Sequence, residues 1–232
     1  MAIINDYGVN TASKLVLLFS IFCVITRSSC LPNSCLLVRK YTMKQNQNYL
    51  LSHTVALIGL MGAGKTTLGR YFARSLSVDF IDSDDEIVKR AGISIPDIFE
   101  LSGEEKFRDI EQRVIADILQ GSPVILSTGG GAFISPKTRE ILGNKSVTIW
   151  LRAEPETLLS RMDNLHSRPL LAKGDPLLTL TNLSDERKRY YEQADVIIDT
   201  DNLSATQALR ELVSALQERD VLRLENTVQK EL

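Results

Sequence analysis

The residues of this chain with the clearest chemical meaning form one short run, residues 59–66, which read GLMGAGKT. The run matches the pattern G-x-x-x-x-G-K-[ST] of a phosphate-binding P-loop at every fixed position. Glycines let the backbone turn tightly, so that its N–H groups reach phosphate oxygens. Lys65 can contact the outer phosphates as a point charge, and the Thr66 hydroxyl can bind Mg²⁺. The run therefore predicts a phosphate-binding site.

Two carboxylates follow a short apolar stretch further along the chain. Asp82 and Asp84 come directly after Phe80-Ile81, which we expect to form a strand. The carboxyl ends of parallel strands face the crevice where ligands bind. A spacing of two directs both side chains to the same side of an extended backbone. Simple capping of the next helix by Asp84 or Asp85 is the alternative interpretation.

Two more groups of residues have the composition expected of one side of a ligand-binding site. Arg108 and Glu111 are three residues apart in a predicted helix, so Glu111 can hold the guanidinium in place. An ordinary surface pair is the alternative. The run 128–131, TGGG, ends another predicted strand, and its three glycines let backbone amides approach a ligand closely.

Three arginines lie in or around residues 161–187: Arg161, Arg168 and Arg187. Arg168 belongs to a polar loop that also contains Gly174. Such a loop is typical of a lid that carries an arginine to a phosphate group.

An alternation of strand and helix patterns must position these residues. From residue 51 on, this alternation favours an α/β domain with a parallel sheet. The predicted strands are 54–58, 79–82, 123–128, 146–151 and 195–199. The predicted helices are 65–76, 84–92, 95–101, 104–120, 136–142, 155–163, 177–193 and 204–218. Continuous apolar runs such as 147–151 are typical of strands that are covered on both faces.

Charge and cysteine content divide the chain into an N-terminal extension (1–50), a main domain (51–218) and a C-terminal tail (219–232). Residues 1–50 contain five Lys or Arg, one acid and all three cysteines. The rest needs no disulfide or thiolate metal site. The formal net charge of −2 gives no reason to expect nucleic-acid binding. Residues 219–232 are expected to fray or to extend the last helix.

The first fifty residues have several interpretations. The apolar run Leu15 to Ile25 is too short for a comfortable membrane span, so no stable membrane association is expected. The segment is basic and nearly free of acids, as organelle-targeting segments are, and the run also suits the core of a signal peptide. Translation from Met43 is the simplest alternative.

Taken in order, the motifs GLMGAGKTT, IDSD, SIPDIF, FRDIE, STGGGAF, RPLL and ERKRYYEQAD resemble the shikimate kinase family, over about residues 54–200. This resemblance implies a three-layer P-loop kinase fold, with a five-stranded parallel sheet between helices. It implies transfer of the γ-phosphoryl group of ATP to the 3-hydroxyl of shikimate, with Mg²⁺, in aromatic amino-acid biosynthesis. We expect a cytoplasmic monomer, or a plastid protein if residues 1–50 are a transit segment.

The resemblance also implies a role for each motif residue. Those expected at the nucleotide are Gly62, Ala63, Gly64, Lys65, Thr66, Thr67, Arg161 and Arg168. Those expected at the substrate are Asp84, Arg108, Glu111, Gly129, Gly130, Gly131 and Arg187. Thr66 and Asp82 are expected at the metal, and Lys65, Asp84 and Arg168 in catalysis.

One departure from the family pattern leaves an assignment open. The usual Arg-x-Pro-x-Tyr run stands here as Arg187-Lys188-Arg189-Tyr190-Tyr191. The distance from Tyr191 favours Arg187 as the arginine for the substrate carboxylate, and Arg189 is the alternative.

Three other functions are alternatives to the shikimate kinase interpretation. A kinase for another hydroxy acid such as gluconate would share the P-loop, but not Asp84, Arg108 and the glycine run in this order. A GTP-dependent switch would need an Asp after Asn144-Lys145, which is lacking here. A relative that binds ligand without catalysis would be expected to lack some of the reactive residues.

Overall fold

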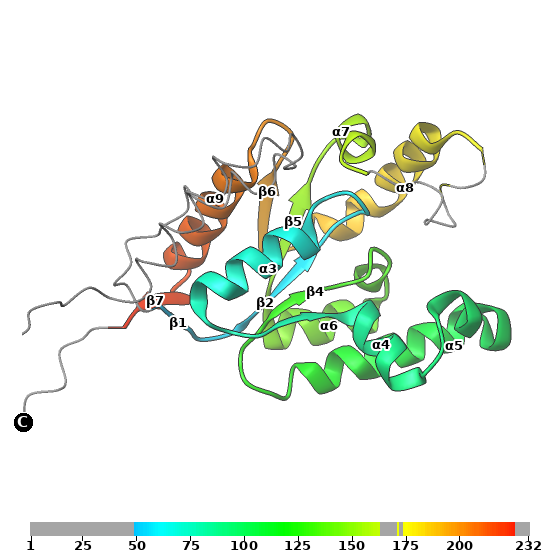
Figure 1. Cartoon of the computed structure of the whole chain (residues 1–232), viewed down its shortest axis with the longest axis horizontal. Coiled ribbons are helices and arrows are strands. Elements are labelled where there is room, and N and C mark those ends of the chain that lie inside the picture. The colour runs from blue at the N-terminus through cyan, green and yellow to red at the C-terminus, as the bar shows by residue number, and fades with distance from the viewer. Residues whose placement is uncertain (1–48, 163–170, 172–173, 226–232) are drawn as a thin grey trace, which may run out of the picture. The chain divides into compact units, whose positions relative to one another are not determined.

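The computed structural model describes residues 49–162, 171 and 174–225 (Figure 1). The N-terminal extension up to residue 48, Arg168 and most of the predicted lid loop lie outside the described residues. At the centre is a five-stranded sheet in the order β3-β4-β2-β5-β6, in which every neighbouring pair is parallel. Its strands are β2 Thr54–Ile58, β3 Phe80–Asp82, β4 Ile125–Ser127, β5 Ser146–Arg152 and β6 Val196–Asp199.

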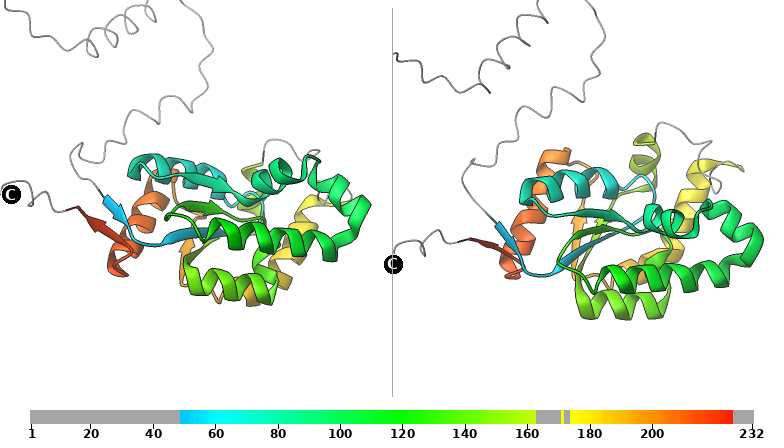
Figure 2. Two further views of the ribbon diagram at one scale, coloured as in Figure 1. Left: turned by 90° about the horizontal axis from the view of Figure 1, so that it is seen from below. Right: turned by 60° about the horizontal axis from the view of Figure 1, so that its bottom comes forward.

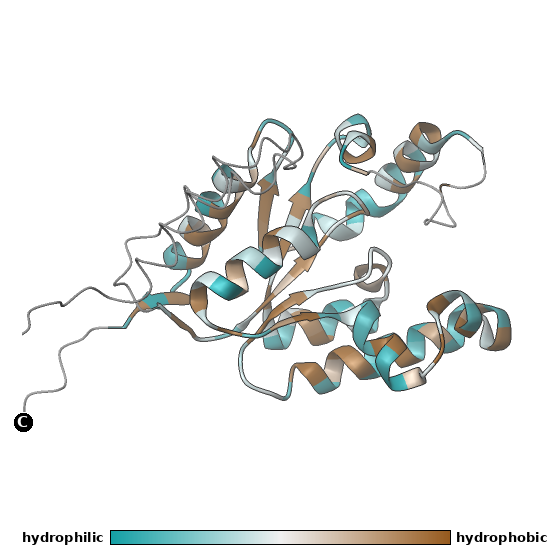
Figure 3. Cartoon of the chain, in the orientation of Figure 1, coloured by the Kyte–Doolittle hydropathy of each residue, from teal (hydrophilic) through white to brown (hydrophobic). Residues whose placement is uncertain are grey.

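The central strands form because their residues are apolar and covered on both faces. All five residues of β2 and all three of β4 are buried, and both strands are mainly brown, the colour of hydrophobic residues, in Figure 3. Strands that are buried on both sides tend to be uniformly apolar instead of alternating. The prediction of a parallel sheet from these runs is confirmed, with strand ends shifted by at most two residues.

Helices cover both faces of the sheet. They are α3 Lys65–Leu76, α4 Ser83–Ala91, α5 Ile95–Ile118, α6 Pro136–Lys145, α7 Pro155–Ser160, α8 Pro176–Tyr191 and α9 Ala205–Glu218. Helices α3 and α9 pack together on one face, and α5 and α6 lie together on the other (Figure 2). Within the described ranges, none of these helices has the length and apolar character needed to cross a membrane. The three-layer α/β fold is thus confirmed.

Helix α5 replaces two predicted helices. It begins with a capping box, in which Ser94 and Asp97 satisfy each other's backbone N–H groups, and Pro96 lies in its first turn. The helix is broken at Gly103, whose φ of 76° lies in the left-handed region. The predicted gap between residues 101 and 104 therefore corresponds to a kink, and the second half carries Arg108 and Glu111.

A second, two-stranded sheet joins the two ends of the described chain. Strand β1 (Tyr49–Leu51) pairs antiparallel with β7 (Leu222–Leu224). The expectation that residues 219–232 fray or extend the last helix is wrong for Leu222–Leu224. The reason is burial: Leu51 and Leu222 are 6% and 2% exposed, so the pairing removes both side chains from water.

Candidate active site

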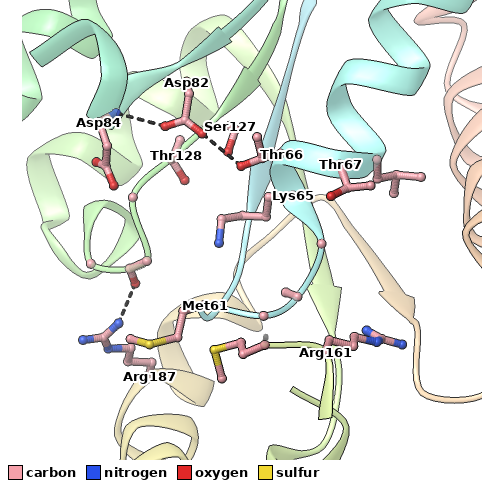
Figure 4. A pocket seen from close by; sticks show the side chains of 18 of the residues that line it. Met61, Lys65, Thr66, Thr67, Asp82, Asp84, Ser127, Thr128, Arg161 and Arg187 are labelled. Atoms are coloured by element: carbon pink, nitrogen blue, oxygen red, sulfur yellow. Dashed lines mark hydrogen bonds between the residues drawn. The ribbon is translucent and has the colours of Figure 1, made fainter. Parts of the chain in front are cut away.

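The predicted site residues line one cavity of about 670 Å³ at the carboxyl ends of β2, β3 and β4 (Figure 4). From the predicted set, the cavity is lined by Gly62, Ala63, Gly64, Lys65, Thr66, Thr67, Asp82, Asp84, Arg108, Glu111, Gly129, Gly130, Gly131, Arg161 and Arg187. Arg168 is the remaining member of that set, and it lies outside the described residues. The parallel sheet explains this convergence, because loops that follow its strands meet at a single edge.

The P-loop needs its glycines for steric reasons. Gly62 has a φ of 82°, and a Cβ there would lie 2.5 Å from the carbonyl oxygen of Leu158. The loop therefore passes too close to α7 for any side chain. The Lys65 Nζ donates hydrogen bonds to the carbonyls of Gly59 and Leu60, at 2.8 and 3.0 Å, and so lies over the loop. Lys65 is also the first residue of α3, whose N-terminal amides favour an anion.

Asp82 connects the P-loop helix to the opposite wall. The Thr66 hydroxyl donates a hydrogen bond to Asp82 Oδ2 at 3.1 Å, and Asp82 Oδ1 accepts one from the Asp84 N–H at 3.1 Å. Asp82 is thus the N-cap of α4. The prediction that Asp82 and Asp84 share one side of an extended backbone is wrong, because Ser83 already begins the helix. Both carboxylates nevertheless line the cavity.

The oxygen atoms of Thr66 and Asp82 fit a magnesium ion in chemical type. A hydroxyl and a carboxylate are hard donors, as Mg²⁺ prefers, and Mg²⁺ usually keeps waters and phosphate oxygens as further ligands. No group of three or more His, Cys, Asp or Glu in the described part of the chain could hold a metal by itself. The residues present therefore fit an ion that is held jointly with bound phosphates.

A buried acid–arginine cluster forms the opposite wall. Arg108 Nη1 donates to Glu111 Oε2 at 2.8 Å, and the Glu111 side chain is only 1% exposed. Burial raises the pKa of Glu111, against the opposing effect of the Arg108 charge. Burial also raises the pKa of Asp84, and the nearby charge of Asp82 adds to this rise. The predicted pairing of Arg108 with Glu111 is confirmed.

The glycine run packs directly against this cluster. A Cβ at Gly129 would lie 2.6 Å from Asp84 Oδ1, and one at Gly131 would lie 2.5 Å from Arg108 Nη2. Only a chain without side chains at these two positions leaves room for Asp84 and Arg108. Gly129 and Gly131 thus lie close to the protein's own side chains, and an approach of the backbone amides to a ligand stays a prediction.

Arg187 enters the cavity from α8. Its Nη1 donates a hydrogen bond to the Gly130 carbonyl at 2.8 Å, and the Tyr191 hydroxyl donates to the same oxygen at 2.5 Å. Arg189 instead donates to the exposed Tyr190 hydroxyl at 2.7 Å and does not line the cavity. The geometry therefore favours Arg187 over Arg189. Tyr191 was not predicted to contribute, although its place in the motif marks it.

The third wall lies where α7 ends and α9 begins. Arg161 donates from Nη1 to the Thr200 hydroxyl at 2.9 Å and from Nη2 to the Thr200 carbonyl at 2.5 Å. Sequence reasoning assigned no individual role to the other lining residues, although some lie in the quoted motifs: Met61, Leu68, Ile95, Phe99, Phe107, Ser127, Thr128, Met162, Thr200, Leu203, Ala205 and Ala208. Most are apolar, and apolar residues in helices are hard to distinguish from core residues by sequence alone.

Comparison with known proteins gives one consistent result. The family model described as shikimate kinase matches residues 61–217. A shikimate kinase of Ruegeria pomeroyi is 45% identical over 176 residues, which are 75% of this chain and 90% of the relative. A shikimate kinase of Nitrobacter winogradskyi is 43% identical over 170 residues, which are 73% of this chain and 79% of the relative.

A solved structure agrees with these sequence matches. The structure described as shikimate kinase from Acinetobacter baumannii in complex with shikimate has a TM-score of 0.68 and 34% identity. The match covers 72% of this chain and 94% of that one. The resemblance seen in the motifs is confirmed by the family match, the relatives and the fold together, and the chain belongs to the shikimate kinase family.

Proposed function

We propose that this chain transfers the γ-phosphoryl group of ATP to the 3-hydroxyl of shikimate, giving shikimate 3-phosphate and ADP. One observation carries the proposal. The phosphate-binding loop and the wall formed by Asp84, Arg108, the glycine run and Arg187 line the same cavity. A phosphate donor and a carboxylate-bearing acceptor can therefore bind side by side, as in-line transfer requires.

The P-loop wall would hold the nucleotide. Backbone amides of residues 62–67 and the Lys65 ammonium would contact the β- and γ-phosphates, and Arg161 would lie beside the adenine. Thr66 and Asp82 would hold a magnesium ion, which when bound neutralises charge on the phosphates. A role for Arg168 at the transferred group is a prediction from sequence.

The opposite wall would hold the acceptor. The guanidinium groups of Arg108 and Arg187 suit a planar carboxylate, since their N–H groups can pair with both of its oxygens. Asp84 would orient the 3-hydroxyl and accept its proton, and its raised pKa makes it a stronger base than an exposed aspartate. The hydroxyl oxygen then bonds to the γ-phosphorus as the bond from that phosphorus to the β-phosphate oxygen breaks.

The test is ADP release, measured with shikimate, gluconate and nucleoside monophosphates as separate acceptors. With ATP as the donor, shikimate should be the only one of these acceptors that supports rapid turnover. Lys65→Met should lower kcat by about 100-fold or more while the fold and shikimate binding persist. Turnover with gluconate or a nucleoside monophosphate, or binding of shikimate with no ADP release, would contradict the proposal.

We further propose a monomer that acts in the cytoplasm without a nucleic-acid partner. Its net charge of −2 gives no bulk attraction to nucleic acid. A plastid location is the alternative. Size-exclusion chromatography and analysis of the native N-terminus test these points.

A further inference from the structure

The guanidinium of Arg108 bonds to a second carboxylate that the proposed mechanism does not use. Its Nη2 donates a hydrogen bond to Glu104 Oε1 at 3.2 Å, while Nη1 is bonded to Glu111. The two acids differ in burial. The Glu104 side chain is 70% exposed, whereas that of Glu111 is 1% exposed. Glu104 is not one of the described residues that line the cavity, so it contacts Arg108 from the solvent side.

The surroundings of Arg108 limit which nitrogen can respond to a ligand. Residues 104, 108 and 111 share one face of α5, because they are spaced by four and three. Nη1 is held by the buried Glu111. A Cβ on Gly131 would lie nearest to Nη2, at 2.5 Å, so Nη2 faces the glycine run that lines the cavity. Nη2 carries two N–H groups, so a carboxylate that enters the cavity can share this nitrogen with Glu104.

We infer that Glu104 is an internal competitor for the substrate carboxylate, because it takes up part of the charge of Arg108 and one N–H group of Nη2. This inference rests on the proposed function. An exposed ion pair between neighbouring helical residues is weak. A carboxylate that reaches both Arg108 and Arg187 forms several charge-assisted hydrogen bonds, which outweigh this competition. An anion that reaches Arg108 alone gains less and is disfavoured, so Glu104 acts as a specificity-determining residue.

The substitution Glu104→Gln tests this inference. It should lower the KM and the Kd for shikimate by about 1.5- to 5-fold, the range expected for loss of an exposed ion pair. The kcat and the KM for ATP should not change. The difference from wild type should shrink in 1 M salt, where the screening length is about 3 Å. With the carboxamide analogue of shikimate in a binding assay, the gain should disappear.

Glu105→Gln is the matched control. Glu105 is equally an exposed acid of α5, and within the described part of the chain no hydrogen bond or ion pair joins it to Arg108. Its removal changes the net charge by the same amount and should leave the KM for shikimate unaltered.

Two results would overturn the inference. The first is an unchanged or raised KM in Glu104→Gln, since Glu104 would then be inert or would position Arg108. The second is an equal decrease in Glu105→Gln, which would indicate a general charge effect. Absence of shikimate-dependent ADP release from the wild-type protein is a separate result, and it would count against the proposed function instead.

Discussion

Asp84 is placed where a carboxylate is useful to a kinase and unfavourable to the folded chain. Because burial raises its pKa, the folded protein binds this proton more tightly than the unfolded chain does. The contribution of Asp84 to stability is therefore fully present below the ordinary pKa of 3.8 and is lost as the pH rises through the raised value. At neutral pH the charged side chain destabilises the fold.

Replacing Asp84 by Asn should exchange activity for stability. We expect Asp84→Asn to raise Tm at pH 7 by about 2–4 °C, or roughly 1 kcal/mol, because no buried charge remains. This gain in Tm should fade as the pH is lowered towards 4. At pH 7 the kcat of the variant should be lower than that of wild type by about 100-fold or more. Thermal melts across this pH range provide the measurement. Asp85→Asn, at a side chain that is 78% exposed, should give no gain, and an equal gain there would refute the explanation.

Arg108 allows a second prediction at the residue scale. Arg108→Lys keeps the charge but loses the planar fork that pairs with a carboxylate. We expect the KM for shikimate to rise about 10- to 100-fold, with a much smaller change in kcat. Steady-state kinetics with shikimate varied at saturating ATP are sufficient. An unchanged KM would remove Arg108 from the carboxylate site.

Single residues were the level at which the sequence was most informative. The spacing of glycines and lysine in the P-loop has few alternative explanations, so it singles out Lys65 by itself. Asp84 and Arg108 depend on the other motifs, because helix capping and a surface ion pair explain each of them equally well. Tyr191 served only to locate Arg187, because the sequence does not show that its hydroxyl reaches the Gly130 carbonyl. Phe99 and Phe107, whose rings stack at 4.5 Å beside the cavity, have the same helical spacing as core residues.

Among the elements, the loop after β4 controls the position of Arg108. Gly131→Ala would place a Cβ 2.5 Å from Arg108 Nη2, and Glu111 restrains the guanidinium from moving aside. We expect the KM for shikimate to rise by about tenfold, with a loss of less than about 1 kcal/mol in unfolding free energy because a side chain absorbs the strain. Kinetics and urea denaturation measure the two quantities.

Gly143→Ala is the matched change within α6. A Cβ at residue 143 meets nothing within 4 Å, so the alanine should stabilise the helix by about 0.5–1 kcal/mol. The KM for shikimate should not change. Equal effects of the two substitutions on the KM would show that the contact with Arg108 has no part in binding.

The elements themselves were largely predictable, for a local reason. Apolar runs and caps such as Ser94 with Asp97 act within a few residues, so helices and strands of the main sheet were placed to within a few positions. The continuity of α5 across Gly103 was not predicted, because a glycine signals a break without showing how the chain continues beyond it.

At the scale of the whole molecule, the β1–β7 ribbon should contribute to stability without affecting the reaction. Leu222 is 2% exposed, and Leu222→Ala should lower the unfolding free energy by about 2–4 kcal/mol. The kcat and both KM values should stay at wild-type levels, since neither strand lines the cavity among the described residues. Denaturant unfolding measures the loss. Leu224→Ala, at a side chain that is 46% exposed, should cost less than about 0.5 kcal/mol.

The pairing of β1 with β7 could not be predicted from the sequence. The two strands have three residues each, and the partners Tyr49 and Leu224 are separated by nearly the whole domain. Short strands carry little periodic signal, and nothing local specifies a partner so distant along the chain.

The pairing of Tyr49 with Leu224 also predicts that the order of the segments along the chain is not essential to the architecture. In a protein cut to residues 49–225, Tyr49 and Leu224 could be connected by a brief linker, and new ends could be opened elsewhere, most simply at the exposed turn of Gly121 and Ser122. Such a circular permutant would begin with β4 and its glycine run and would keep the same sheet. The cavity would then be built from the same walls in a different order of synthesis.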